Sequence, residues 1–374
     1  MTGIFTSESV GKGHPDKICD QISDGILDAV LQNDKHAKVA IEVMASNRLV
    51  IIGGELTTST YVDFVKVAWG ILMNLGYTEN DFSIISNVNK QSEEIRNSVD
   101  LKDDIGSGDQ GIMFGYATDE TASYMPIAIT VAHELVKKAE ELRISKKFKE
   151  LKSDMKSQVT VDYMENGDIE VRDVLMSIQH TSDYKKEKFA QDVKNLIIEP
   201  TISKFFKNKN YRTLVNPSGS FVVGGPIGDT GLTGRKIIVD TYGGMARHGG
   251  GAFSGKDCTK VDRSAAYAAR WVAKNLVASG IAKKLEIQLS YAIGVSQPIS
   301  ISYETFGTET ISKDKISEIV NKVFDLSPRG IIRDLELQNP VYLQTAVYGH
   351  FGREDLNLSW EKLNKVEEIK KSLK

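Results

Sequence analysis

The sequence Gly249-Gly250-Gly251-Ala252-Phe253-Ser254-Gly255-Lys256-Asp257 is the most informative stretch of this chain. It overlaps a glycine-rich segment, residues 219–255, which contains 12 of the chain's 31 glycines. Glycine allows positive φ angles and lets a backbone approach a ligand closely. This density of glycine therefore indicates a binding surface, and a loop that only turns a corner is the alternative.

Charged side chains accompany these glycines. Lys236, Lys256 and Lys260 supply positive charge, and Asp257 and Asp262 are potential ligands of a divalent cation. The other charged residues that we assign to this surface are Arg235, Arg247 and Asp229. Free backbone N–H groups, lysines and carboxylates together suit a bound polyphosphate.

Composition places the chain among ordinary globular proteins. It has 374 residues, of which 41% are apolar and 26% charged, enough for two or three domains with their own cores. A net charge of −3 argues against a general nucleic-acid binder. Cys19 and Cys258 are too few for a disulfide framework and fit a reducing cytosol. No apolar run approaches the roughly 18 residues of a membrane span, and no signal-peptide pattern begins the chain, so we expect a cytoplasmic protein without membrane contact.

Helix, strand hairpin and helix follow one another three times. The first helices are expected over residues 15–33, from residue 126 past 142, and over 262–279. The hairpins are expected at 39–45 with 49–56, 158–164 with 169–178, and 285–293 with 299–305, and the closing helices at 61–75, 183–197 and 314–326. This order predicts an α+β fold of three similar domains, each a small mixed sheet with helices packed on one face. We expect them at residues 1–100, 106–222 and 224–365.

A glycine-containing loop precedes the first helix of each repeat, at residues 11–17, 106–111 and 249–257. Helix N-termini attract anions. A strand is also expected between residues 109 and 126, after the second loop. Residues 93–108 are polar and glycine-flanked, which fits either a mobile lid or an idle surface loop.

Other nucleotide-binding and catalytic motifs are absent. Residues 250–256 nearly match a P-loop, but Asp257 replaces the Ser or Thr that would hold magnesium, and the strand expected at 236–241 lies too far away. No dinucleotide fingerprint, nucleophile elbow or paired C-x-x-C occurs. His14 could cap a helix, and Asp16 could interact favourably with the dipole of that helix in its first turn. Either a structural or a functional role is therefore open for both residues. Glu42 and Glu55 lie on expected strands, where carboxylates are usually solvated.

Together these motifs resemble the S-adenosylmethionine synthetase (methionine adenosyltransferase) family over essentially the whole chain. The resemblance lies in residues 13–17, 106–111 with 114–116, 224–229, 234–236, 242–248 and 249–257. It implies that ATP, L-methionine and water give S-adenosylmethionine, phosphate and diphosphate. It also implies two Mg²⁺ ions and one K⁺ ion per site, pseudo-threefold symmetry, and a homodimer with shared active sites, expected to pair into a homotetramer.

The resemblance also implies roles for individual residues. His14 would lie at the breaking C5′–O5′ bond, Asp16 and Asp262 would bind Mg²⁺, and Glu42 would bind K⁺. The polyphosphate would contact Lys17, Lys156, Arg235, Lys236 and Lys256, and Lys260 would face either the polyphosphate or the methionine. Methionine would be held by Glu55, Gln91, Asp109 and Asp229, the nucleotide would contact Phe221, Asp154, Ser220 and Ala252, and the segment after Gln91 would be the gating loop.

Two positions depart from the family pattern. Ser220 stands where family members usually carry Arg, and Cys258 where Pro is common. Apart from the resemblance, the lysine–carboxylate loop alone is also compatible with an ATP-dependent phosphotransferase, an ATPase or a nucleotide-binding module without activity.

Overall fold

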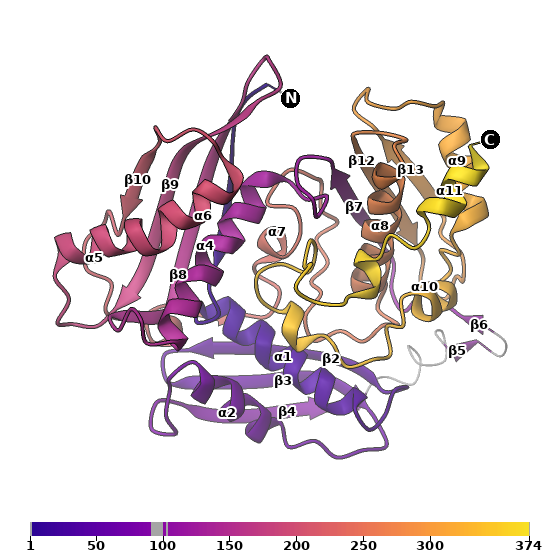
Figure 1. Cartoon of the computed structure of the whole chain (residues 1–374). Coiled ribbons are helices and arrows are strands. Elements are labelled where there is room, and N and C mark those ends of the chain that lie inside the picture. Colours follow the sequence, from indigo (N-terminus) through magenta and orange to yellow (C-terminus); the bar gives the residue numbers. More distant parts are fainter. Residues whose placement is uncertain (1, 91–99, 102–103, 374) are drawn as a thin grey trace.

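The computed structural model describes residues 2–90, 100–101 and 104–373. Three sheets are arranged around a central group of helices and loops, and each sheet carries helices on one face (Figure 1). The α+β class and the three-domain arrangement expected from the sequence are confirmed.

The first sheet has the strand order β11-β2-β3-β4. Helix α1 begins with Pro15 after His14 as its N-cap, and it buries Ile18, Ile22, Ile26 and Val30 against the sheet. The elements of this unit are α1 (Pro15–Leu31), β2 (Lys38–Ser46), β3 (Leu49–Thr57), α2 (Phe64–Asn74), β4 (Ser83–Asn89) and β11 (Gly231–Leu232). Helix α2 starts three residues later than expected because the Asp63 side chain caps it at the N–H of Lys66.

The second sheet has the order β1-β8-β9-β10, and α4 covers one of its faces together with α6. Its strands are β1 (Gly3–Val10), β8 (Leu151–Tyr163), β9 (Ile169–His180) and β10 (Arg212–Val215). Its helices are α4 (Ile127–Ile144), α5 (Lys186–Val193) and α6 (Glu199–Phe205). A π-helical stretch, Lys194–Ile198, joins α5 to α6, so the closing helix runs further than expected.

The third sheet is antiparallel, with the order β13-β12-β7. Its strands are β7 (Gly111–Thr118), β12 (Lys284–Tyr291) and β13 (Ser300–Glu304). Its helices are α8 (Val261–Ala278), α9 (Lys313–Val323), α10 (Pro328–Asp334) and α11 (Val366–Ser372). Strand β7 is the additional strand expected after the second glycine loop. Two short antiparallel strands, β5 (Asp100–Leu101) and β6 (Asp104–Ile105), precede it.

Each sheet takes an edge strand from a different part of the chain. Strand β1 pairs with β8 of the second sheet, β7 pairs with β12 of the third, and β11 pairs with β2 of the first. The three sequence ranges 1–100, 106–222 and 224–365 therefore describe the repeat along the chain, while every sheet combines two of them. As domain boundaries these ranges stay a prediction.

The prediction of a strand at residues 236–241 is wrong. This segment forms a single helical turn, α7 (Ile237–Asp240), closed by a hydrogen bond from the N–H of Asp240 to the carbonyl of Lys236. The β-branched Ile237, Ile238 and Val239 suggest a strand, but tertiary contacts of Asp240 and its neighbours decide the local conformation.

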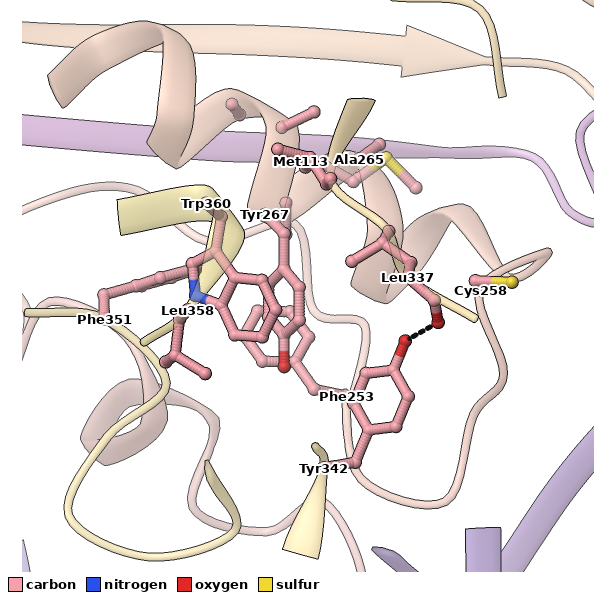
Figure 2. Packing of buried hydrophobic residues seen from close by; sticks show 14 of the residues in the cluster. Met113, Phe253, Cys258, Ala265, Tyr267, Leu337, Tyr342, Phe351, Leu358 and Trp360 are labelled. Carbon is pink, nitrogen blue, oxygen red and sulfur yellow. Dashed lines mark hydrogen bonds between the residues drawn. The ribbon is translucent and has the colours of Figure 1, made fainter. Parts of the chain in front are cut away.

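Aromatic side chains fill the core beside α8. Tyr267 stacks on Trp360 with 4.0 Å between ring centroids, and Phe253 meets Tyr267 edge-on at 5.6 Å (Figure 2). Phe253 belongs to the glycine loop, so its buried ring anchors that loop to the core.

Glu361 is the centre of a buried ionic cluster in the third unit. Its carboxylate accepts hydrogen bonds from Arg270 at 3.1 Å, Lys274 at 2.8 Å and the N–H of Gly352 at 2.9 Å. Burial opposes ionisation, but the two cations hold the pKa of Glu361 below its usual value.

We predict that Glu361→Gln lowers the free energy of unfolding by about 3–5 kcal/mol, because the buried Arg270 loses its counter-charge and Lys274 keeps only the exposed Glu354. Urea unfolding measures the change. Glu318→Gln is the control, since Glu318 pairs with Lys315 on the exposed surface and should matter little. Equal stabilities of wild type and Glu361→Gln would contradict the structural importance of this cluster.

Candidate active site

The first part of the site lies at the N-terminus of α1. The Asp16 carboxylate accepts a hydrogen bond from the Nζ of Lys236 at 2.6 Å and another from the N–H of Leu232 at 3.0 Å. Arg235 lies 3.7 Å from the same carboxylate. Burial opposes ionisation of Asp16, but the hydrogen bonds from Lys236 and Leu232 lower its pKa. The turn after β11 thus brings two cations to the start of α1.

His14 is buried beside this pair. Its Nδ1 accepts a hydrogen bond from the N–H of Asp16 at 3.2 Å. Burial lowers the pKa of His14 to about 3, helped by Lys236 and other nearby lysines and opposed by Asp16. The imidazole is therefore neutral at neutral pH, and because Nδ1 accepts, its proton lies on Nε2. His14 is both an N-cap and a potential donor.

Asp154 and Lys156 lie on β8, next to β1 and the chain that leads to His14. Asp154 is buried and accepts a hydrogen bond from the N–H of Gly225 at 2.8 Å, while its other oxygen has no partner. Burial raises the pKa of Asp154 to about 6. Lys156 is exposed and contributes to the lowered pKa of His14, so its charge acts on the same region.

The glycine loop lies along the free edge of β2. The carbonyl of Gly255 accepts a hydrogen bond from the N–H of Ile41 at 3.0 Å, and the N–H of Asp257 donates to the carbonyl of Val39 at 3.0 Å. Gly255 has φ +80°, and a Cβ there would overlap the carbonyl oxygen of Ile41. The approach of two backbones thus requires glycine at this position.

The second part of the site lies where this loop meets α8. The Nζ of Lys256 is 2.6 Å from a carboxylate oxygen of Asp262, in the first turn of α8. Gly251 lies so close that a Cβ would overlap the Asp262 side chain. Ala252 lies against the turn at Gly234, and a Cβ added at Gly234 would overlap the Cβ of Ala252. In the part of the chain that the structure describes, no hydrogen bond or ion pair joins the Lys256–Asp262 pair to the Asp16–Lys236 pair.

A row of aspartates on α1 supports both parts, and the sequence analysis missed it. Asp16, Asp20, Asp24 and Asp28 are four residues apart and share one side of the helix. Each accepts backbone N–H groups from another segment: Leu232 for Asp16, Gly234 for Asp20, Gly255 for Asp24, and Tyr342 with Leu343 for Asp28. The repeated four-residue spacing of Asp along the helix is the signal that could have revealed it.

The structure changes the reading of Lys17. Its ammonium group is fully buried and binds Asp20 at 2.9 Å as well as Asp240. Burial opposes the charge of Lys17, but the two carboxylates raise its pKa above the usual value. Successive helix residues differ by about 100° around the axis, so Lys17 points away from its neighbour Asp16 into the protein. The polyphosphate contact expected of Lys17 has no support in this geometry.

Asp257 differs from expectation, whereas Glu42 does not. Asp257 is buried and accepts hydrogen bonds from the N–H of Val39, from Thr259 and from the Nζ of Lys260, which leaves it no free position for a cation. Glu42 on β2 is exposed, as carboxylates on strands usually are.

The remaining expected residues are spread over the surface. Those with exposed side chains are Glu55, Asp109, Ser220 and Asp229, whereas Phe221 is partly buried next to His180. Gln91 and most of the expected lid, residues 91–99 and 102–103, lie outside the described residues. Among the described residues, no group of three His, Cys, Asp or Glu side chains could by itself hold a metal ion. No helix in the described ranges is long and apolar enough to cross a membrane.

Comparison with known proteins shows the family of the chain. Residues 2–98, 104–221 and 223–362 match the models of the N-terminal, central and C-terminal domains of S-adenosylmethionine synthetase. The chain is 63% identical over 372 residues to an S-adenosylmethionine synthase of Mycoplasmopsis pulmonis, with 99% of both chains covered. It is 53% identical over 389 residues to one of Clostridium botulinum, covering 99% of this chain and all of the relative. The protein belongs to the S-adenosylmethionine synthetase family.

Proposed function

We propose that this protein makes S-adenosylmethionine by attack of the methionine sulfur on C5′ of ATP, with release of tripolyphosphate. The same site then hydrolyses tripolyphosphate to phosphate and diphosphate. Its family makes the protein a methionine adenosyltransferase, an enzyme of S-adenosylmethionine biosynthesis. The proposal concerns the route of the reaction and the residues that carry it.

The observation that supports this route is the pairing of lysines with carboxylates at the two helix N-termini. Lys236 with Asp16 and Lys256 with Asp262 hold the charges that a Mg²⁺–polyphosphate complex needs. Asp16 and Asp262 would hold the Mg²⁺ of such a complex, and Lys236 and Lys256 would then contact phosphate oxygens in place of these carboxylates. Arg235, Lys156 and Lys260 complete the positive surface. Glu42, which is exposed, is available for K⁺.

The attack of the methionine sulfur on C5′ needs no general base. A thioether is neutral and has no proton to lose, so the barrier lies in orienting the sulfur and stabilising the leaving tripolyphosphate. Bound Mg²⁺, two ions per site, would neutralise part of the charge on the phosphate oxygens. The neutral His14 would donate a hydrogen bond from its Nε2–H to the oxygen that leaves C5′ and would keep its proton. The lysines hold the phosphate chain through the later hydrolysis.

For the other substrate groups we retain the assignments that the resemblance implies. Methionine is held by Glu55, Gln91, Asp109 and Asp229, and the nucleoside contacts Asp154, Ser220, Phe221 and Ala252. The free oxygen of the buried Asp154 supports this assignment, because a ribose hydroxyl would satisfy it.

We further propose a homodimer whose sites combine residues of both chains, in the cytoplasm, with pairing of dimers into tetramers. No described helix covers the face of the first sheet opposite α1 and α2, which presents Met44, Ile51, Ile85 and Leu232, each between 36% and 53% exposed. An apolar sheet face of this kind is typical of a subunit interface. A second chain on this face could bring its Lys256–Asp262 group to the Asp16–Lys236 group of the first.

The proposed reaction is tested by incubating the protein with ATP, Mg²⁺ and K⁺, with and without methionine. We expect a sulfonium product, phosphate and diphosphate only when methionine is present. Phosphate release without an adenosylated product would instead identify an ATPase or phosphotransferase, and ATP binding without turnover a binding module.

Lys256→Ala should lower kcat by about 10²–10³-fold, the scale for loss of one preorganised electrostatic contact in the transition state. Steady-state kinetics with ATP and methionine measure it. Lys138→Ala is the control because Lys138 pairs with Glu141 on the outer side of α4. A loss below about threefold would contradict a contact between Lys256 and the phosphate chain.

Shared sites predict complementation between two inactive variants. Asp16→Ala and Asp262→Ala, unfolded together in equal amounts and refolded, should recover about a quarter of wild-type activity, because half of the dimers are mixed and each of these has one intact site. If each site is built from one chain, the refolded mixture will remain as inactive as its components.

A further inference from the structure

Asp24 is a buried carboxylate without a role in the proposed chemistry. It lies on α1 and has no exposed surface. One of its oxygens accepts the N–H of Gly255 at 2.8 Å and a guanidinium N–H of Arg263 at 2.6 Å, and the other accepts a second guanidinium N–H of Arg263 at 2.9 Å. This bidentate pair has a fixed geometry, because both partners are planar.

Arg263 extends this contact to the rest of the glycine loop. It lies in the first turn of α8, is 1% exposed, and donates to the carbonyls of Phe253 at 3.0 Å and Lys256 at 3.4 Å. Its Nε donates to the hydroxyl of Tyr267 at 3.0 Å. The N–H of Gly255 and the carbonyls on either side of it are therefore fixed by a single ion pair.

The loop depends on such fixation. The backbone at Gly255 has φ +80°. Glycine can adopt this conformation, but it adopts negative φ angles about as readily. Lys256 follows directly, and its side chain carries the positive charge of the second part of the site. A different backbone geometry at Gly255 would redirect this ammonium group by several ångströms.

We propose that Asp24 and Arg263 are positioning residues for the reaction, which fix the glycine loop so that Lys256 points at the phosphate chain. This inference rests on the proposed function, since it assumes that Lys256 contacts polyphosphate. Neither Asp24 nor Arg263 touches the substrate. Each acts through the backbone of residues 253–256.

The row of aspartates supplies a matched control. Asp28 lies one turn further along α1 and likewise accepts two backbone N–H groups, those of Tyr342 and Leu343, both at 2.9 Å. The segment that it holds contains none of the residues assigned to the reaction. Asp28→Asn therefore shows how much kcat falls when a carboxylate contact of α1 is lost. Asp24→Asn should lower kcat further, because it also displaces Lys256.

The experiment compares kcat per folded molecule for Asp24→Asn, Asp28→Asn, Lys256→Ala and the double variant Asp24→Asn/Lys256→Ala. A misplaced catalytic group can cost about 10²-fold, so Asp24→Asn should lose about that much while Asp28→Asn keeps the wild-type kcat. The double variant should be no slower than Lys256→Ala alone, because the function of Asp24 is lost once Lys256 is absent. If Asp24→Asn does not fold, Arg263→Lys replaces it, since lysine keeps one charge contact and loses the fork.

A wild-type kcat for Asp24→Asn or Arg263→Lys would overturn the inference. So would losses that multiply in the double variant, which would show that Asp24 affects catalysis independently of Lys256. A wild-type kcat for Lys256→Ala would contradict the proposed function itself, and this result is distinguishable from the other two.

Discussion

Backbone N–H groups bound by carboxylates of α1 are the interactions on which the arrangement of the site depends. Asp16, Asp20 and Asp24 hold Leu232, Gly234 and Gly255, three positions in a region where glycine leaves the backbone little preference of its own. Buried carboxylates are costly unless they are paired and hydrogen-bonded. Here the pairing partners are Lys236, Lys17 and Arg263. The helix thus fixes the two segments of its own chain that carry Lys236 and Lys256.

The strand exchange among the three sheets serves the same end. Because β11 pairs with β2 and the glycine loop continues along the same edge at Ile41 and Val39, the C-terminal part of the chain is attached to the first sheet directly beneath α1. The helix and the edge of the sheet hold these loops from two sides. A site that binds a flexible, highly charged polyphosphate needs such a fixed surface, because preorganised charges act without further reorganisation.

The sequence predicted the repeat, the helices and the hairpins well, because these depend on local periodicity and capping. Ile18 and Ile22 on α1 and the hairpin between β2 and β3 are examples. Long-range contacts could not be predicted from the sequence. The pairing of β1 with β8 joins residues about 150 positions apart, and no local pattern encodes it. Lys17 was assigned to the ligand by its place in a motif, whereas the geometry of the helix turns it toward Asp240. A residue that belongs to a motif is expected to be important, but the direction of its side chain is needed to assign its role.

The central claim is that the α1 N-terminus and the glycine loop contact one phosphate chain. A crystal structure with Mg²⁺, methionine and a non-hydrolysable ATP analogue tests it most directly. The account predicts that the phosphates lie between Lys236 and Lys256, with Asp16 and Asp262 released from these lysines and bound to Mg²⁺. A phosphate chain bound away from either lysine, with both ion pairs intact, would contradict it.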